Sequence, residues 1–104
     1  MVHSFTEGES FEQLVYNNPL PVIVHFYANW CGPCKKLGPI LESDAAKQNF
    51  CLVKVNVDDH PDLADKFQVK GIPYVVLFKG QEKLHDFAGN NNDELQIMYS
   101  KLNW

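Results

Sequence analysis

The chain has 104 residues, of which 45% are hydrophobic and 21% charged, and its formal net charge is −4. This length favours a single domain over residues 1–104 with its own core, and the composition excludes a disordered protein. The acidic balance gives no general attraction for nucleic acid or anionic membranes, and the longest apolar run, residues 75–78, is too short to span a bilayer.

The first half of the chain predicts strands that alternate with helices. A short strand over residues 2–5 precedes a helix over residues 10–17, where apolar residues recur three and four positions apart. Residues 21–27 are β-branched, aromatic and almost continuously apolar, which is typical of a central strand buried on both faces. A long helix begins at or just after Cys31 and runs to about residue 48, and an internal proline is expected to kink it.

The second half continues the alternation and ends differently. Residues 51–57 form a strand, and residues 61–67 form a short helix that starts with a proline. Residues 74–79 and 83–88 resemble a hairpin, and residues 92–102 form a closing helix. The sequence therefore predicts an α/β fold, a mixed sheet of about five strands flanked by about four helices that cover both faces.

The run Trp-Cys-Gly-Pro-Cys at residues 30–34 lies between the buried strand and the long helix. Cys31 is therefore expected at a helix N-terminus, where free backbone N–H groups and the helix dipole favour a thiolate. The dipole contributes up to about 2 kcal/mol, or roughly one pKa unit, so the S–H of Cys34 is needed as a further donor. Cys34 lies three residues on and faces the same side, so it can attack a mixed disulfide formed at Cys31. Gly32 permits close approach of a substrate backbone, and Pro33 stiffens the first turn.

Two other interpretations of the cysteine pair compete with catalysis. Cys-x-x-Cys is also half of a zinc site, which Cys51 and His60 could complete, but zinc knuckles usually lie in tight turns between strands. A purely structural pair is the other alternative, and Trp30 in the adjacent loop favours function over it. We therefore expect no metal, and we interpret Cys51 as a small buried hydrophobe rather than a regulatory thiol.

The number of cysteines and the first residues bear on location. Three cysteines are an odd set, which suits a reducing compartment better than a secreted, disulfide-stapled domain. Residues 1–7 carry neither a basic region nor an apolar region of the kind found in secretory signals. A cytoplasmic protein is the expectation.

Two segments resemble the thioredoxin family. The first is Val-Ile-Val-His-Phe-Tyr-Ala-Asn-Trp-Cys-Gly-Pro-Cys-Lys-Lys-Leu-Gly-Pro at residues 22–39, and the second is Val-Lys-Gly-Ile-Pro-Tyr at residues 69–74, followed by Leu-Phe-Lys-Gly at 77–80. The likeness covers essentially the whole chain in order and length, and Cys-x-x-Cys beside a βαβ pattern is itself a general signature of thioredoxin-like redox proteins. The resemblance implies the thioredoxin fold and a general protein-disulfide reductase that works through a redox-active Cys31–Cys34 disulfide without a bound cofactor.

The resemblance also implies roles for individual residues. Cys31 would be the attacking nucleophile and Cys34 the buried resolving thiol. Pro73 would follow a cis peptide bond, and Ile72 would offer backbone hydrogen bonds to an extended substrate. Lys54 matches a lysine that thioredoxins often carry beside the active site, as a possible neighbour in proton transfer. A flat apolar docking surface would be formed by Trp30, Gly32, Pro33, Ile72, Pro73 and Gly89.

Partners follow from the same resemblance. The expected electron donor is a flavin-dependent, NADPH-fed thioredoxin reductase. The expected clients are disulfides in proteins such as peroxiredoxins, ribonucleotide reductase and methionine sulfoxide reductase, so that the protein would carry electrons in cell redox homeostasis. We expect a monomer, although an apolar face around Trp30 also suits a weak dimer.

The chain departs from the family pattern at His25, where thioredoxins usually place a buried aspartate beneath the resolving cysteine. Burial and nearby Lys54 both disfavour a charged imidazole, so we expect His25 to be neutral at pH 7. A neutral ring could accept the proton of Cys34 as a general base. The alternative is a core histidine that is merely hydrogen-bonded to backbone or water. A second departure is Asp44, which falls where helical periodicity expects an apolar residue, and a rotation that exposes it is the simplest account.

Three functions remain open at this point. A reductase is favoured because Gly-Pro between the cysteines suits a reductant, whereas isomerases of this fold often carry Gly-His. An oxidase or isomerase of the same fold is the second possibility. The third is a binding module without redox activity, which the presence of both cysteines argues against.

Overall fold

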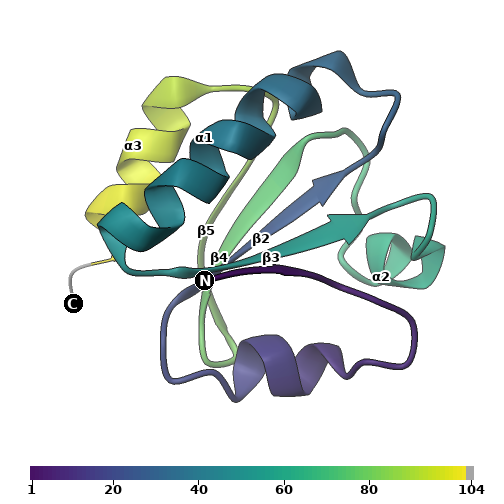
Figure 1. Cartoon of the computed structure of the whole chain (residues 1–104), viewed down its shortest axis with the longest axis horizontal. Helices are drawn as coiled ribbons and strands as arrows, with labels where there is room; N and C mark the ends of the chain where they lie inside the picture. The colour runs from purple at the N-terminus through teal and green to yellow at the C-terminus, as the bar shows by residue number, and fades with distance from the viewer. Residues whose placement is uncertain (103–104) are drawn as a thin grey trace.

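The computed structural model describes residues 1–102, so residues 103–104 of the predicted single domain lie outside it. Five strands form one sheet in the order β1-β3-β2-β4-β5 (Figure 1). They are β1 (Val2–Ser4), β2 (Val22–Tyr27), β3 (Cys51–Asn56), β4 (Tyr74–Lys79) and β5 (Glu82–Ala88). β1, β3 and β2 run parallel, whereas β4 is antiparallel to both of its neighbours. The predicted mixed sheet is confirmed.

Helices cover both faces of this sheet. They are α1 (Gly32–Gln48), α2 (Pro61–Lys66), α3 (Asn92–Ser100) and a short π-helical segment, η1 (Glu12–Tyr16). α1 and α3 lie on one face, and η1 and α2 lie on the other (Figure 1). The α/β architecture with about four helices is therefore confirmed.

Two helices differ from the sequence prediction in type or length. In η1 the N–H of Asn17 bonds to the carbonyl of Glu12, five residues earlier, so the turn is wider than the α-helix predicted over residues 10–17. The closing helix ends at Ser100 instead of residue 102. There the N–H groups of Lys101 and Leu102 bond only three residues back, which tightens the final turn.

β2 is the central strand, with β3 on one side and β4 on the other. All of its residues from Val22 to Phe26 are buried, because helices shield both faces of the sheet. His25 is the one polar side chain in this run, and it pairs in register with Lys54 of β3. The strand thus carries an imidazole into the interior directly behind the cysteine loop.

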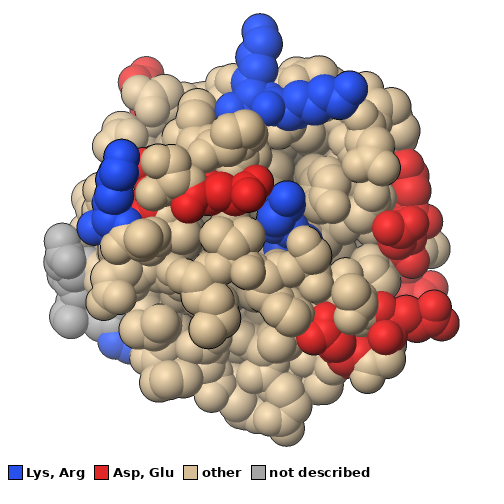
Figure 2. All heavy atoms as spheres, in the orientation of Figure 1, with Lys and Arg blue, Asp and Glu red and all other residues tan. Residues whose placement is uncertain are grey.

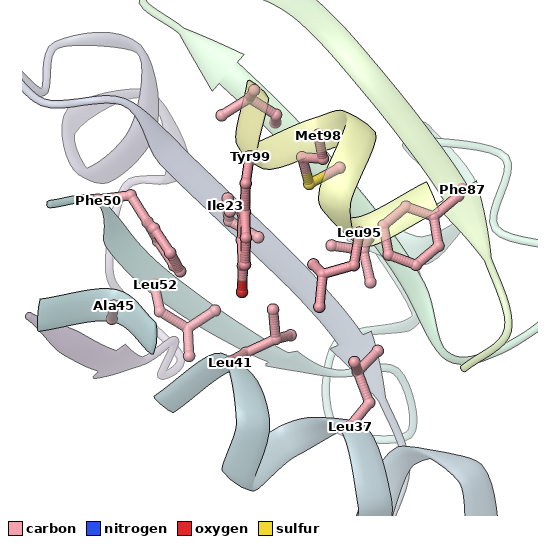
Figure 3. Close-up of a cluster of buried hydrophobic side chains, with 12 residues drawn as sticks. Ile23, Leu37, Leu41, Ala45, Phe50, Leu52, Phe87, Leu95, Met98 and Tyr99 are labelled. Carbon is pink, nitrogen blue, oxygen red and sulfur yellow. The ribbon is translucent and has the colours of Figure 1, made fainter. Parts of the chain in front are cut away.

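The face under α1 and α3 holds a dense apolar cluster (Figure 3). Figure 3 shows Leu37 and Leu41 of α1 and Leu95 and Met98 of α3 pointing toward one another above the sheet. Deleting one such buried leucine side chain typically lowers stability by about 2–5 kcal/mol. This packing fixes α1 on the sheet, and therefore fixes the position of its N-terminus beside the end of β2.

Asp44 is a correction to the sequence prediction, because it is half-buried rather than rotated out to solvent. Its carboxylate accepts a hydrogen bond of 2.8 Å from the hydroxyl of Tyr99, which ties α1 to α3. Burial, together with the hydrogen bond to Asp44 and its charge, raises the pKa of Tyr99 well above its ordinary value. A polar residue interrupts the apolar stripe because the buried tyrosine hydroxyl needs an acceptor.

Replacing Tyr99 with phenylalanine is expected to lower the free energy of unfolding by about 1–2 kcal/mol, because the Asp44 carboxylate loses its donor. Urea unfolding measures the change. Tyr16→Phe is the matched control, since Tyr16 contacts Phe11 and Phe78 through its ring and its hydroxyl makes no hydrogen bond within residues 1–102. Equal stability of the two variants would contradict a structural role for this bond.

Candidate redox site

The Cys31–Cys34 pair lies where β2 gives way to α1. Cys31 is the N-cap residue of α1, with an extended backbone (φ −88°, ψ 109°), and its Sγ accepts the N–H of Cys34 at 3.2 Å. The two cysteines form a disulfide with their Cα atoms 5.3 Å apart. The predicted position of the pair at a helix N-terminus is confirmed, and this end of the helix favours a thiolate sulfur.

The first turn of α1 follows from its two intervening residues. Pro33 lies within the first two helical positions, where its missing N–H leaves no bond unmade. Apart from its chain neighbours and the backbone of its own helix, no heavy atom of residues 1–102 lies within 4 Å of the place where a Cβ on Gly32 would stand. The surface in front of the disulfide is therefore open to an approaching chain.

Two further segments meet the cysteine loop. The Ile72–Pro73 peptide bond is cis, as the resemblance implied, and Ile72 packs against the buried cluster of Ala28, Cys31 and Cys34. The carbonyl of Pro73 accepts the N–H of Gly89 at 2.8 Å. Gly89 has a φ of +88°, a conformation that favours glycine. Ile72 therefore lies against the cysteine pair, and Gly89 is joined to the next residue, Pro73.

Trp30 is 69% exposed, and its indole N–H donates to Asp58 at 2.9 Å. Between Trp30 and Ile72 lies an open groove of about 460 Å³. Its other lining residues are Val57, Pro61, Ala64, Asp65, Val69, Lys70 and Gly71. Sequence reasoning missed this groove and Asp58, because no spacing along the chain relates residues 57–71 to Trp30.

His25 lies behind the disulfide, where it and Cys34 line a second cleft of about 390 Å³. The side chain is 1% exposed, and neither ring nitrogen has a hydrogen-bond partner within residues 1–102. Burial, and secondarily the charge of Lys54, lowers the pKa of His25 to about 4. The ring is therefore neutral at pH 7, as predicted, but it does not make the backbone hydrogen bond of an ordinary core histidine.

An ion pair stands at the wall of the same cleft. The Nζ of Lys54 lies 3.3 Å from Oε2 of Glu42 and 5.4 Å from the centre of the Tyr27 ring. A Cβ built on Gly38 would lie 3.9 Å from Oε2 of Glu42 and 4.0 Å from Cε1 of His25, so Gly38 leaves space between these two side chains on the wall of the cleft. Sequence reasoning missed Glu42. The signal was its spacing, because residues 34, 38 and 42 share one face of a helix.

The zinc alternative gains no support from the structure. Cys51 is buried in the apolar cluster on the opposite face of the sheet from α1, and His60 bonds through Nε2 to the carbonyl oxygen of Phe5 at 3.1 Å. Among residues 1–102, no three His, Cys, Asp or Glu side chains are grouped so that they could hold a metal ion. In the same range, no helix has the length and apolar character needed to cross a bilayer.

Comparison with known proteins finds a match to the family model described as Thioredoxin over residues 2–101. The mitochondrial thioredoxin of Mus musculus is 41% identical over 99 residues, which cover 92% of this chain and 60% of the relative. Thioredoxin Y1, chloroplastic, of Arabidopsis thaliana is 39% identical over 83 residues, which cover 78% of this chain and 48% of that protein. The crystal structure of reduced Schistosoma mansoni thioredoxin matches with a TM-score of 0.88 at 28% identity, and the match covers 97% of each chain.

These relatives correct the expected location. The chain spans about 60% of the length of the mitochondrial relatives it matches, and relatives named mitochondrial and chloroplastic point to an organelle rather than the cytoplasm. The prediction of a cytoplasmic protein is therefore wrong on this comparison. It rested on a preference for reducing conditions, and such conditions do not identify one compartment.

Proposed function

The chain belongs to the thioredoxin family, and on that premise we propose that it is a general protein-disulfide reductase. The observation that carries the proposal is the Cys31–Cys34 disulfide at the N-terminus of α1, beneath an open apolar surface. A dithiol in this position has one sulfur activated by the helix end and a second sulfur within bonding distance of the first.

The reaction is two successive thiol–disulfide exchanges. The thiolate of Cys31 attacks one sulfur of a client disulfide, which forms a mixed disulfide and releases the other client sulfur as a thiolate. Cys34 then loses its proton to His25 and attacks the Sγ of Cys31. The Cys31–Cys34 bond forms, the bond to the client breaks, and the second client sulfur leaves as a thiolate that takes a proton from solvent. The client gains two electrons and the cysteine pair loses two.

The client is expected to bind in an extended conformation across the docking surface. Ile72 lines the groove beside Trp30, so an extended client segment could add there as a strand and place an apolar side chain in the groove. Figure 2 shows acidic side chains gathered on the side of the molecule where α2 lies and basic side chains at the end where α1 begins. This separation of charge would help to orient a client during encounter.

Recycling of the disulfide requires a reductant. Membership of the family supports an NADPH-fed thioredoxin reductase as the proposed donor, and disulfide-containing proteins such as peroxiredoxins, ribonucleotide reductase and methionine sulfoxide reductase as the proposed clients. The redox-active disulfide is itself the working group, so no bound cofactor enters the scheme.

A redox titration of the Cys31–Cys34 pair separates a reductase from an oxidase of the same fold. Equilibration with glutathione or dithiothreitol buffers, followed by thiol alkylation and mass measurement, gives the reduction potential. We expect a value close to the −270 mV typical of thioredoxin, about 150 mV below a strong oxidant such as DsbA. A potential near −120 mV would instead assign an oxidase.

Insulin reduction separates a reductase from a binding module. With dithiothreitol as electron donor, the protein is expected to accelerate insulin precipitation well above the uncatalysed rate. Cys51→Ser is a suitable control, because Cys51 is buried on the far face of the sheet and the variant keeps the active pair. A wild-type rate equal to background would overturn the reductase proposal and favour a binding role.

A further inference from the structure

A polar hollow lies next to the groove that runs between Trp30 and Ile72. It has a volume of about 330 Å³ and is called the lysine hollow below. Its polar lining residues are Gln68, Lys70, Tyr74, Lys83 and Asp86. The groove and the lysine hollow share two lining residues, Lys70 and Gly71, so this short strip of chain forms the ridge between them.

The ridge is low at Gly71. Apart from the chain neighbours of Gly71, no heavy atom of residues 1–102 lies within 4 Å of the place where a Cβ on this residue would stand. The next residue along the chain is Ile72, beside which an extended client segment is proposed to add as a strand. A segment docked there can therefore cross the ridge and place one of its side chains in the lysine hollow.

The lysine hollow carries an excess of positive charge on a chain whose formal net charge is −4. Its lining holds two lysines and a single carboxylate, that of Asp86. This carboxylate is already engaged, because it accepts the hydroxyl of Tyr74 at 2.5 Å and Nζ of Lys83 at 3.2 Å. The same bonds hold the pKa of Asp86 below its ordinary value. Lys83 and Asp86 therefore balance one another, and the charge of Lys70 is left over.

Lys70 has the donors that this excess charge implies. The residue is exposed, and its ammonium group has no ion-pair or hydrogen-bond partner within residues 1–102. An ammonium group has three N–H donors, so Lys83 also keeps donors after its bond to Asp86. Two ammonium groups that line one hollow and still have free donors suit a carboxylate as their ligand.

Gln68 adds an amide to this lining at a conformational cost. The N–H of Gln68 bonds to the carbonyl of Asp65 at 3.0 Å, and the next N–H bonds to the carbonyl of Ala64 at 2.9 Å, which closes α2. Gln68 has a φ of +55°, a conformation that glycine adopts freely and other residues rarely. Backbone strain of this kind is concentrated at functional sites, and the side chain of Gln68 lines the hollow.

We propose that the lysine hollow is a specificity site that binds the carboxylate of a glutamate or aspartate in the client segment docked beside Ile72. Lys70 and Lys83 supply the charge, and the amide of Gln68 supplies a further donor. The inference rests on the proposed disulfide reductase, because the ligand is part of the client. Neighbouring side chains of an extended segment point to opposite sides, so the acidic residue must stand at a fixed spacing from the attacked cysteine.

Peptide probes with one cysteine test this site. Each probe is a mixed disulfide between its cysteine and thionitrobenzoate, so attack by Cys31 of the reduced protein releases the coloured thiol and gives a second-order rate constant. Glutamate or its uncharged isostere glutamine is placed at each position of the peptide in turn. At one spacing, the glutamate probe is expected to react about fivefold faster than the glutamine probe, the effect of an ion pair at a partly exposed site.

Variants of the hollow should change this glutamate preference in opposite directions. Lys70→Met removes the unpaired charge and should abolish the preference. Asp86→Asn removes a repelling carboxylate and releases Lys83, so it should increase the preference. Opposite changes of this kind do not arise from a loss of folding, which would slow both probes. Lys47→Met is the matched control, because it removes the same charge from an exposed residue in the last turn of α1 and should leave the preference unchanged.

The outcomes separate the specificity site from the reductase. Equal rates for glutamate and glutamine at every position of the peptide would overturn the site alone. A preference that persists in Lys70→Met, or that falls equally in Lys47→Met, would also overturn it. No reaction with any probe would overturn the reductase and with it this site.

Discussion

Cys34→Ser is expected to turn the protein into a covalent trap for its clients, with turnover reduced to the uncatalysed background. Cys31 keeps its position at the N-terminus of α1, so it still attacks a client disulfide. The serine hydroxyl that replaces the second thiol cannot complete the exchange, because it forms no disulfide with Cys31. The mixed disulfide therefore persists instead of resolving.

Incubation of Cys34→Ser with insulin, followed by non-reducing mass spectrometry, measures the trapped adduct. Cys31→Ser is expected to give neither turnover nor adduct, and Cys51→Ser should turn over normally, because that thiol is buried away from the pair. Adducts formed by Cys31→Ser through Cys34 would reverse the proposed roles of the two sulfurs. Normal turnover in Cys34→Ser would remove the resolving step altogether.

The parts of this site that the sequence predicts are those encoded by local pattern. The continuous apolar run of β2 placed that strand at the centre of the sheet, and the following Cys-Gly-Pro-Cys placed the pair at a helix N-terminus. Both inferences use only short-range rules, because a buried strand and a helix start are each recognisable within about ten residues. The cis bond before Pro73 came from family resemblance instead, and the structure contains it.

The parts that the sequence does not predict depend on contacts between distant segments. The acceptor for the Tyr99 hydroxyl is Asp44, 55 residues away, and the acceptor for the Trp30 indole is Asp58, 28 residues away. Each of these carboxylates stands in a sequence context that gives no hint of its partner. Glu42 could have been found from its helical spacing to Cys34. Its ion pair with Lys54 could not, because Lys54 lies on β3, which is placed beside β2 only by the register of the sheet.

Stability should fall as the pH falls from about 6.5 to about 4, and His25 is expected to be the main cause. Its pKa is lowered to about 4 in the folded protein, from about 6.5 in an unfolded chain. Above pH 6.5 the ring is neutral in both states, so it adds no pH dependence. Between these values the unfolded chain binds a proton that the folded protein does not, and roughly 3 kcal/mol of stability is lost across the interval.

His25→Leu removes this titration and also removes two buried nitrogens without partners, at a site that is 1% exposed. The variant is expected to be more stable than the wild type by about 1–3 kcal/mol at pH 7, because each unsatisfied polar group is costly to bury. Its advantage should grow by roughly 3 kcal/mol between pH 7 and pH 4, as measured by urea unfolding at each pH. All other residues are the same in the two proteins, so their contributions cancel in the difference. A difference that stays constant with pH would show that the ring is as basic inside the fold as outside it. A growing difference, combined with slow attack by Cys34 in the same variant, would mean that the fold retains a destabilising imidazole at this position because disulfide exchange requires it.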